Sequence, residues 1–119
     1  MSDERGAADT DRPTAHDIAA RLIAFGEVRT RVFEPFAMPV NDIAWQLLLR
    51  CFVAQERGLR TSIYRLCDDM SVPKSVSVRW LRALRGCGMV EYDEEAGALS
   101  AAVRLSTKAE SVLRDLLDA

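Results

Sequence analysis

The segment Thr61–Val90 constrains the fold of this chain more than any other stretch. Its pattern predicts two short helices joined by a tight turn, with the first helix over Ile63–Asp69 and the turn over Met70–Val72. Pro73 has no backbone N–H, so it suits the start of the second helix, where that donor would have no partner. The segment therefore predicts a helix–turn–helix unit.

The second helix of this unit has two unlike faces. Its apolar residues fall on one side of a helix: Val76, Trp80, Leu81 and Leu84. The other side is mainly cationic, with these residues on or near it: Lys74, Ser75, Val78, Arg79, Arg82 and Arg85. A helix that is apolar behind and cationic in front, at the end of a helix–turn–helix, suits insertion into a DNA groove.

The positive charge is concentrated in the same region. The whole chain has a net charge of −2, which by itself would not favour a nucleic-acid partner. Residues 50–85, however, carry eight basic and three acidic side chains, a net charge of +5, whereas residues 1–49 carry −3 and residues 86–119 carry −4. Distribution matters more than the sum for binding a polyanion. A solvated helix surface is the simpler explanation for the charge alone.

Composition limits the class of protein. With 119 residues, 49% of them hydrophobic, the chain is long enough for one domain with a real core, and we assign it to residues 15–119. Residues 1–14 are polar and are expected to form a flexible tail. The sequence has no membrane-length apolar run and no secretory signal, so we expect a cytoplasmic protein. Three cysteines without close pairing fit a reducing compartment.

Before the helix–turn–helix, two further helices are expected. Apolar residues recur every three to four positions from Ala15 and predict an amphipathic helix that ends before Pro35. Asn41 is a good N-cap for a helix over Asp42–Glu56, which is apolar around more than half of its circumference and should be central and buried. Gly58 closes this helix, and Leu59–Thr61 is expected to be extended.

After Gly86 and Gly88 stop the helical pattern, a β-hairpin is expected. Val90–Tyr92 and Val103–Leu105 are strand-like, and the acidic stretch Asp93–Ser100 between them is rich in turn residues. A last helix, Lys108–Leu117, follows a cap at residues 105–107. The predicted fold class is mostly α: a winged helix-turn-helix with a short β-hairpin wing and flanking helices.

This order of elements resembles the winged helix-turn-helix regulators of the MarR type. Three local matches carry the resemblance: Leu66–Arg79 (LCDDMSVPKSVSVR), Leu84–Val90 (LRGCGMV) and Val103–Lys108 (VRLSTK). They cover the turn and start of the recognition helix, the exit into the wing, and the return strand. No single piece is specific, but the three occur in the right order and spacing.

The resemblance implies a homodimer built from the first and last helices, with recognition helices in successive major grooves of double-stranded DNA. By position, the residues that would face the DNA are Lys74, Ser75, Val78, Arg79 and Arg82. The family usually has an arginine at the wing tip, whereas this wing begins with three carboxylates, Asp93, Glu94 and Glu95. Phosphates would repel them, so the wing is expected to add little to DNA affinity or to serve a protein partner.

Catalytic and metal chemistry are not expected. His16 is the only histidine, there is no Cys-x-x-Cys pair, and no glycine-rich loop could hold a phosphate, so we predict no enzyme activity, metal or cofactor. Cys51 and Cys67 occupy apolar helix positions, while Cys87 is the candidate for exposure and for redox sensing. A cluster of apolar residues could line a pocket for a small aromatic effector, although packing in the core is the simpler explanation: Phe33, Phe36, Met38 and Trp45. Core packing is also the simpler explanation for Trp80.

The leading function is a DNA-binding transcriptional regulator. One alternative is a winged-helix protein–protein interaction module, in an accessory or antirepressor role, that uses the acidic wing. Another is a dimerising scaffold that has lost DNA binding. The cationic face of the helix after Pro73 separates the three.

Overall fold

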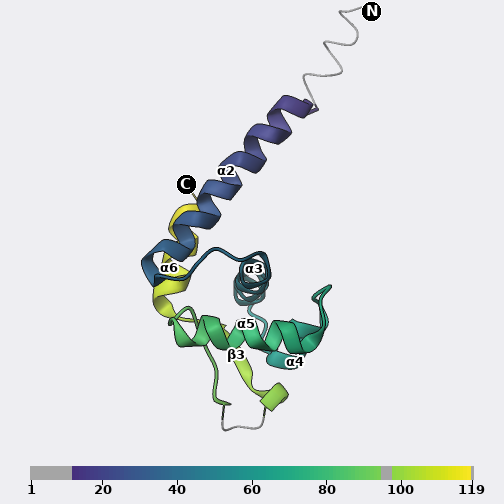
Figure 1. Ribbon diagram of the computed structural model, residues 1–119, viewed down its shortest axis with the longest axis vertical. Coiled ribbons are helices and arrows are strands. Elements are labelled where there is room, and N and C mark those ends of the chain that lie inside the picture. The colour runs from purple at the N-terminus through teal and green to yellow at the C-terminus, as the bar shows by residue number, and fades with distance from the viewer. Residues whose placement is uncertain (1–11, 95–97, 119) are drawn as a thin grey trace, which may run out of the picture.

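The computed structural model describes residues 12–94 and 98–118 and shows a mostly helical chain with a small antiparallel sheet (Figure 1). Most of the predicted tail, residues 1–11, lies outside the described residues. In chain order the elements are α2 (Ala15–Phe33), the 3-10 helix η1 (Glu34–Phe36), α3 (Asp42–Glu56), β1 (Thr61–Ser62), α4 (Ile63–Asp68), α5 (Lys74–Gly86), β2 (Val90–Glu91), the 3-10 helix η3 (Ala98–Ser100), β3 (Ala102–Leu105) and α6 (Thr107–Leu117).

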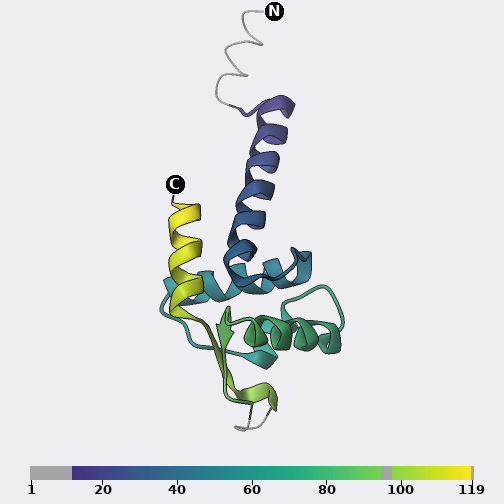
Figure 2. The same ribbon diagram turned by 60° about the vertical axis from the view of Figure 1, so that its left-hand side comes forward.

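Helix α2 begins and ends where its sequence pattern predicts. Thr14 and Asp17 form a reciprocal cap, in which each side chain accepts a hydrogen bond from the other's backbone N–H, at 3.1 and 3.2 Å. Figures 1 and 2 show α2 rising from the rest of the chain, with α6 beside its later half. Val32 and Phe33 are buried at its C-terminal end, but the apolar residues of the first half are exposed. The predicted apolar stripe is therefore covered at one end only.

Helix α3 is the central helix, as its composition predicts. The Asn41 side chain caps it by accepting hydrogen bonds from the N–H groups of Ile43 and Ala44. One face is fully buried: Ala44, Leu47, Leu48 and Cys51. Gly58 ends the helix with a φ of +67°, and the N–H groups of residues 58 and 59 return to the carbonyls of residues 55 and 54.

The sheet has the order β1-β3-β2, with both pairs antiparallel. Leu59–Thr61, which was expected to be extended, pairs with β3 only from Thr61, because the Leu59 N–H is used to close α3. Thr61 pairs with Val103, and Val90 pairs with Leu105. The predicted hairpin is confirmed with small shifts at its ends, and the short helix η3 before β3 was not predicted.

The core lies between α3, α5, the sheet and α6. Ser106 caps α6 by accepting from the Ala109 N–H at 3.1 Å, as predicted, and this orients the helix so that Ala109 and Leu113 are fully buried. Among residues 12–94 and 98–118, none of the helices combines the length and apolar character needed to cross a lipid bilayer.

Candidate nucleic-acid interface

The turn between α4 and α5 sets the position of α5. Ser62 caps α4 by accepting from the Arg65 N–H, and residues 70–72 bend the chain into Pro73. Pro73 is the residue before the helix rather than its first residue: its backbone is extended, and its carbonyl accepts hydrogen bonds from Val76 and Ser77. At the other end, Gly88 has a φ of +85° and turns the chain toward β2. A short turn and a glycine stop therefore hold α5 at both ends.

The buried face of α5 is rotated from the predicted one. Leu81 and Leu84 are fully buried as expected, but Ser77 is buried beside them, while Val76 and Trp80 are only half-buried. The Ser77 hydroxyl is buried without a hydrogen-bond partner among the described residues. Sequence reasoning missed Ser77 because a serine carries no apolar signal.

The first half of α5 presents two cations and a hydroxyl. Lys74 lies with its Nζ 3.7 Å from the centre of the Tyr64 ring, a cation–π contact that fixes its direction. Ser75 and Arg79 are exposed, and Arg79 makes no ion pair with any residue in the described part of the chain. Val78, which we expected to face outward, is half-buried and packs against the core.

The second half of α5 is paired with the loop after β2. Glu94 places its two carboxylate oxygens 3.7 Å from Nε of Arg82 and 3.6 Å from Nη1 of Arg85. Arg85 also donates from Nε to the Tyr92 carbonyl at 3.0 Å and lies over the Tyr92 ring. Burial raises the pKa of Tyr92, and the charge of Glu94 adds to that rise. The rest of the predicted acidic tip, residues 95–97, lies outside the described residues.

These contacts divide the helix electrostatically. Lys74 lies at its N-terminal end, where the helix dipole also favours anions, and Arg79 lies in the second turn. Arg82 and Arg85 already have a carboxylate beside them, which lowers their attraction for a second anion. Of the five predicted site residues, the structure therefore leaves Ser75 and Arg79 exposed and Lys74 half-buried beside Tyr64, all three without an acidic partner among the described residues.

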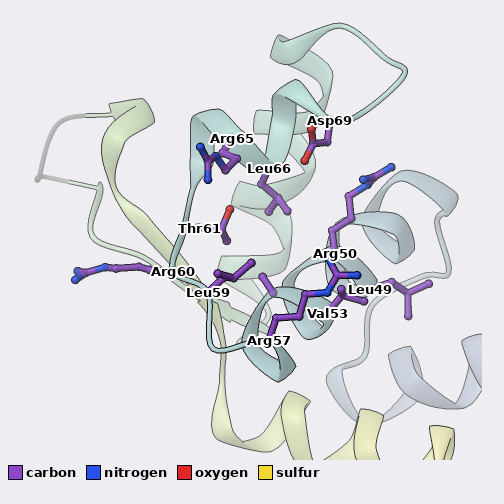
Figure 3. Close-up of a pocket in the computed structure, with 11 residues that line it drawn as sticks. Leu49, Arg50, Val53, Arg57, Leu59, Arg60, Thr61, Arg65, Leu66 and Asp69 are labelled. Carbon is purple, nitrogen blue, oxygen red and sulfur yellow. The ribbon is translucent and has the colours of Figure 1, made fainter.

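Half of the basic residues between positions 50 and 85 lie outside α5. They surround a pocket between α3 and α4 (Figure 3): Arg50, Arg57, Arg60 and Arg65. Our sequence reasoning counted these charges but did not place them. The available signal was the spacing of Arg50, Val53 and Arg57, which puts all three on the same side of α3 and its C-terminal cap.

The three cysteines are all free thiols. Cys51 and Cys67 are buried, as predicted, and burial raises the pKa of Cys51 to about 12. Cys87 is half-buried; its Sγ lies 3.5 Å from the Met38 sulfur, and burial raises its pKa as well. In the described part of the chain, no three His, Cys, Asp or Glu side chains gather as a metal site would require.

The aromatic cluster considered for an effector is packed into the protein. Phe33 is fully buried with its ring centre 6.3 Å from that of Trp45, and Phe36 is nearly so, with the Lys108 ammonium 4.7 Å from its ring. These contacts fit the packing interpretation of the cluster.

Comparison with known proteins bears on the fold alone. No protein-family model matches the chain, and no curated protein matches it. Among solved structures, the AF1382 protein of Archaeoglobus fulgidus is similar with a TM-score of 0.56 and 18% sequence identity, over 66% of this chain and 84% of that one. The likeness shows that the two proteins share a fold over most of their length.

Proposed function

We propose that this chain is a winged helix-turn-helix protein that binds duplex DNA as a homodimer and regulates transcription. Helices α4 and α5 would form the helix–turn–helix, α5 would be the recognition helix in the major groove, and the β2–β3 pair would be the wing. The sequence resemblance to MarR-type regulators and the observed order of these elements support the assignment.

The observation that carries the proposal is the exposed start of α5. Lys74, Ser75 and Arg79 project from the first half of a helix whose other face is anchored in the core by Leu81 and Leu84. Lysine and arginine bind phosphates or guanine edges, and serine can contact either. The absence of an acidic partner for Arg79 among the described residues leaves its charge available. Such a face is suited to a polyanion.

The exposed side of α2 supports the homodimer. Ile18, Leu22 and Phe25 are 46%, 65% and 59% exposed, and they lie along one face because their spacing matches the helical repeat. A contiguous exposed apolar face of this kind is typical of an interaction surface. In the proposed dimer, a second copy of α2 and α6 covers it.

A second candidate is a protein-interaction module, and the position of Glu94 favours it. Because Glu94 already pairs with Arg82 and Arg85, the wing side of α5 has less free positive charge than its sequence indicates. An acidic wing of this kind could contact a basic protein partner instead of DNA.

Duplex binding across a salt series distinguishes the two candidates. Fluorescence anisotropy of labelled duplexes, including a pool of random sequences, should give an observed association constant that falls steeply with salt, because phosphate contacts release counterions. Micromolar or weaker binding with a flat salt dependence on every duplex would favour the protein-interaction module. Enrichment of one sequence from the pool would give the preferred site.

A further inference from the structure

The pocket between α3 and α4 has a volume of about 340 Å³, within the size range of small-molecule sites. Its apolar lining comes from both elements and the segment that joins them, and includes Leu49, Val53, Leu59 and Leu66. Val53 and Leu59 are 45% and 58% exposed, so the pocket holds apolar surface that the fold itself leaves uncovered.

Arginines surround this apolar surface. Arg50 comes from α3, Arg57 is the residue that caps its C-terminal end, and Arg65 comes from α4 on the opposite side (Figure 3). Arg60 also lines the pocket, but Figure 3 shows its guanidinium directed away from those of Arg50 and Arg57. One carboxylate, Asp69, is present at the same site, so the lining has a clear excess of positive charge.

None of these four guanidinium groups has an ion pair, a hydrogen bond or a ring contact with any residue in the described ranges. The pocket arginines differ in this respect from other arginines of the molecule. Other arginines of the chain are paired with carboxylates, including Arg82, Arg104 and Arg114. Because Asp69 balances at most one of these four charges, a bound anion would reduce the repulsion among the arginines.

We propose that this pocket binds a small organic anion with an apolar body, such as an aromatic or short-chain carboxylate or sulfonate. Arg50 and Arg57 would bind the anionic group, since guanidinium groups match the geometry of carboxylates, and Arg65 would add positive charge from the opposite side of the pocket. Val53, Leu59 and Leu66 would contact the apolar body. The pocket is separate from the exposed start of α5, so the proposal does not depend on DNA binding.

The test uses two fluorescent probes with closely related aromatic bodies. One is 1-anilinonaphthalene-8-sulfonate, which is anionic, and the other is N-phenyl-1-naphthylamine, which lacks the sulfonate. Each is titrated against the full chain, and binding is located by amide NMR shifts at Leu59, Thr61 and Leu66. We expect saturable binding of the sulfonate at these residues and at least ten-fold weaker binding of the uncharged probe.

Variants identify the groups responsible. The double variant Arg57→Gln/Arg65→Gln should weaken sulfonate binding at least five-fold, and Leu59→Gln should weaken both probes. Arg31→Gln is the matched control, because Arg31 is an exposed arginine on α2, away from the pocket. Circular dichroism confirms that each variant is folded. Equal binding of both probes, unchanged binding in the double variant, or shifts confined to α2 would each overturn the proposal.

Discussion

Glu94 lies with Oε2 3.6 Å from Nη1 of Arg85, and with Oε1 3.7 Å from Nε of Arg82. A carboxylate that follows β2 thus reaches back to the second half of α5 and occupies two of its cations. If α5 binds DNA, Glu94 competes with phosphate for these arginines. The acidic loop then weakens binding by screening the helix as well as by repelling the duplex.

Replacing Glu94 should therefore strengthen DNA binding. Exposed ion pairs contribute about 0.2–1 kcal/mol, so Glu94→Gln should raise duplex affinity by about 1.4- to five-fold at low salt. Glu91→Gln is the control, because it removes the same charge from a residue that pairs with Arg104 on the neighbouring strand instead. Anisotropy titrations in parallel measure both variants. An equal gain in both would mean that net charge alone, and not the pairing with α5, sets the affinity.

Substitution on the exposed face of α2 should dissociate the proposed dimer. Leu22→Asp puts a charge in the apolar face, and burying an unpaired charge is strongly unfavourable, so sedimentation equilibrium should show a monomer. Ala20→Asp is the control, because Ala20 is also exposed but lies about half a turn around the helix from Ile18. A wild-type protein that is monomeric at tens of micromolar would contradict the dimer itself.

Local signals in the sequence predicted most of the fold. The caps at Asn41, Ser62 and Ser106, together with the glycine stops at Gly58 and Gly88, act within a few residues, so they placed the helix ends to within about one residue. Strand ends were less accurate, because pairing partners 13 to 42 residues away decide them; β1, for example, depends on Val103.

The candidate site was predicted less completely. The pattern identified the cationic face of α5, but pairing of Arg82 with Glu94 depends on how the loop after β2 folds back, which no local signal encodes. The sequence provided the net charge of residues 50–85 but not the grouping of the pocket arginines, since they come from two helices and the segment between them. Contacts between elements, rather than within them, were the information that the sequence lacked.

Removing the Ser77 hydroxyl should stabilise the protein. The hydroxyl is buried without a partner among the described residues, and alanine has the higher helix propensity, so Ser77→Ala should add about 0.5–1.5 kcal/mol to the free energy of unfolding. Urea unfolding followed by circular dichroism measures it. Ser75→Ala, on the exposed side of the same helix, should change stability by a few tenths of a kcal/mol at most. A loss of stability in Ser77→Ala would show that the hydroxyl is hydrogen-bonded in solution.

The cysteines should react slowly with thiol reagents. The thiolate is the reactive form, and burial raises the pKa of Cys87 above its ordinary value and that of Cys51 to about 12, so both are protonated at pH 7. In titrations with a disulfide reagent, Cys87 should react first, faster as the pH is raised, and Cys51 only on unfolding. Rapid oxidation of Cys87 by peroxide at pH 7, with a change in DNA binding, would support redox sensing and contradict this prediction.

The most direct test of the central claim is the salt dependence of duplex binding in Arg79→Ala. Each phosphate contact contributes about 0.9 to the slope of log K against log salt on B-DNA. If Arg79 contacts a phosphate, its removal should lower affinity and make the slope shallower by about two such contacts, one from each copy in the dimer. Arg31→Ala, which removes a charge from α2, should leave the slope unchanged. Equal slopes in wild type and Arg79→Ala, together with equal affinities, would contradict a DNA-binding role for this face of α5.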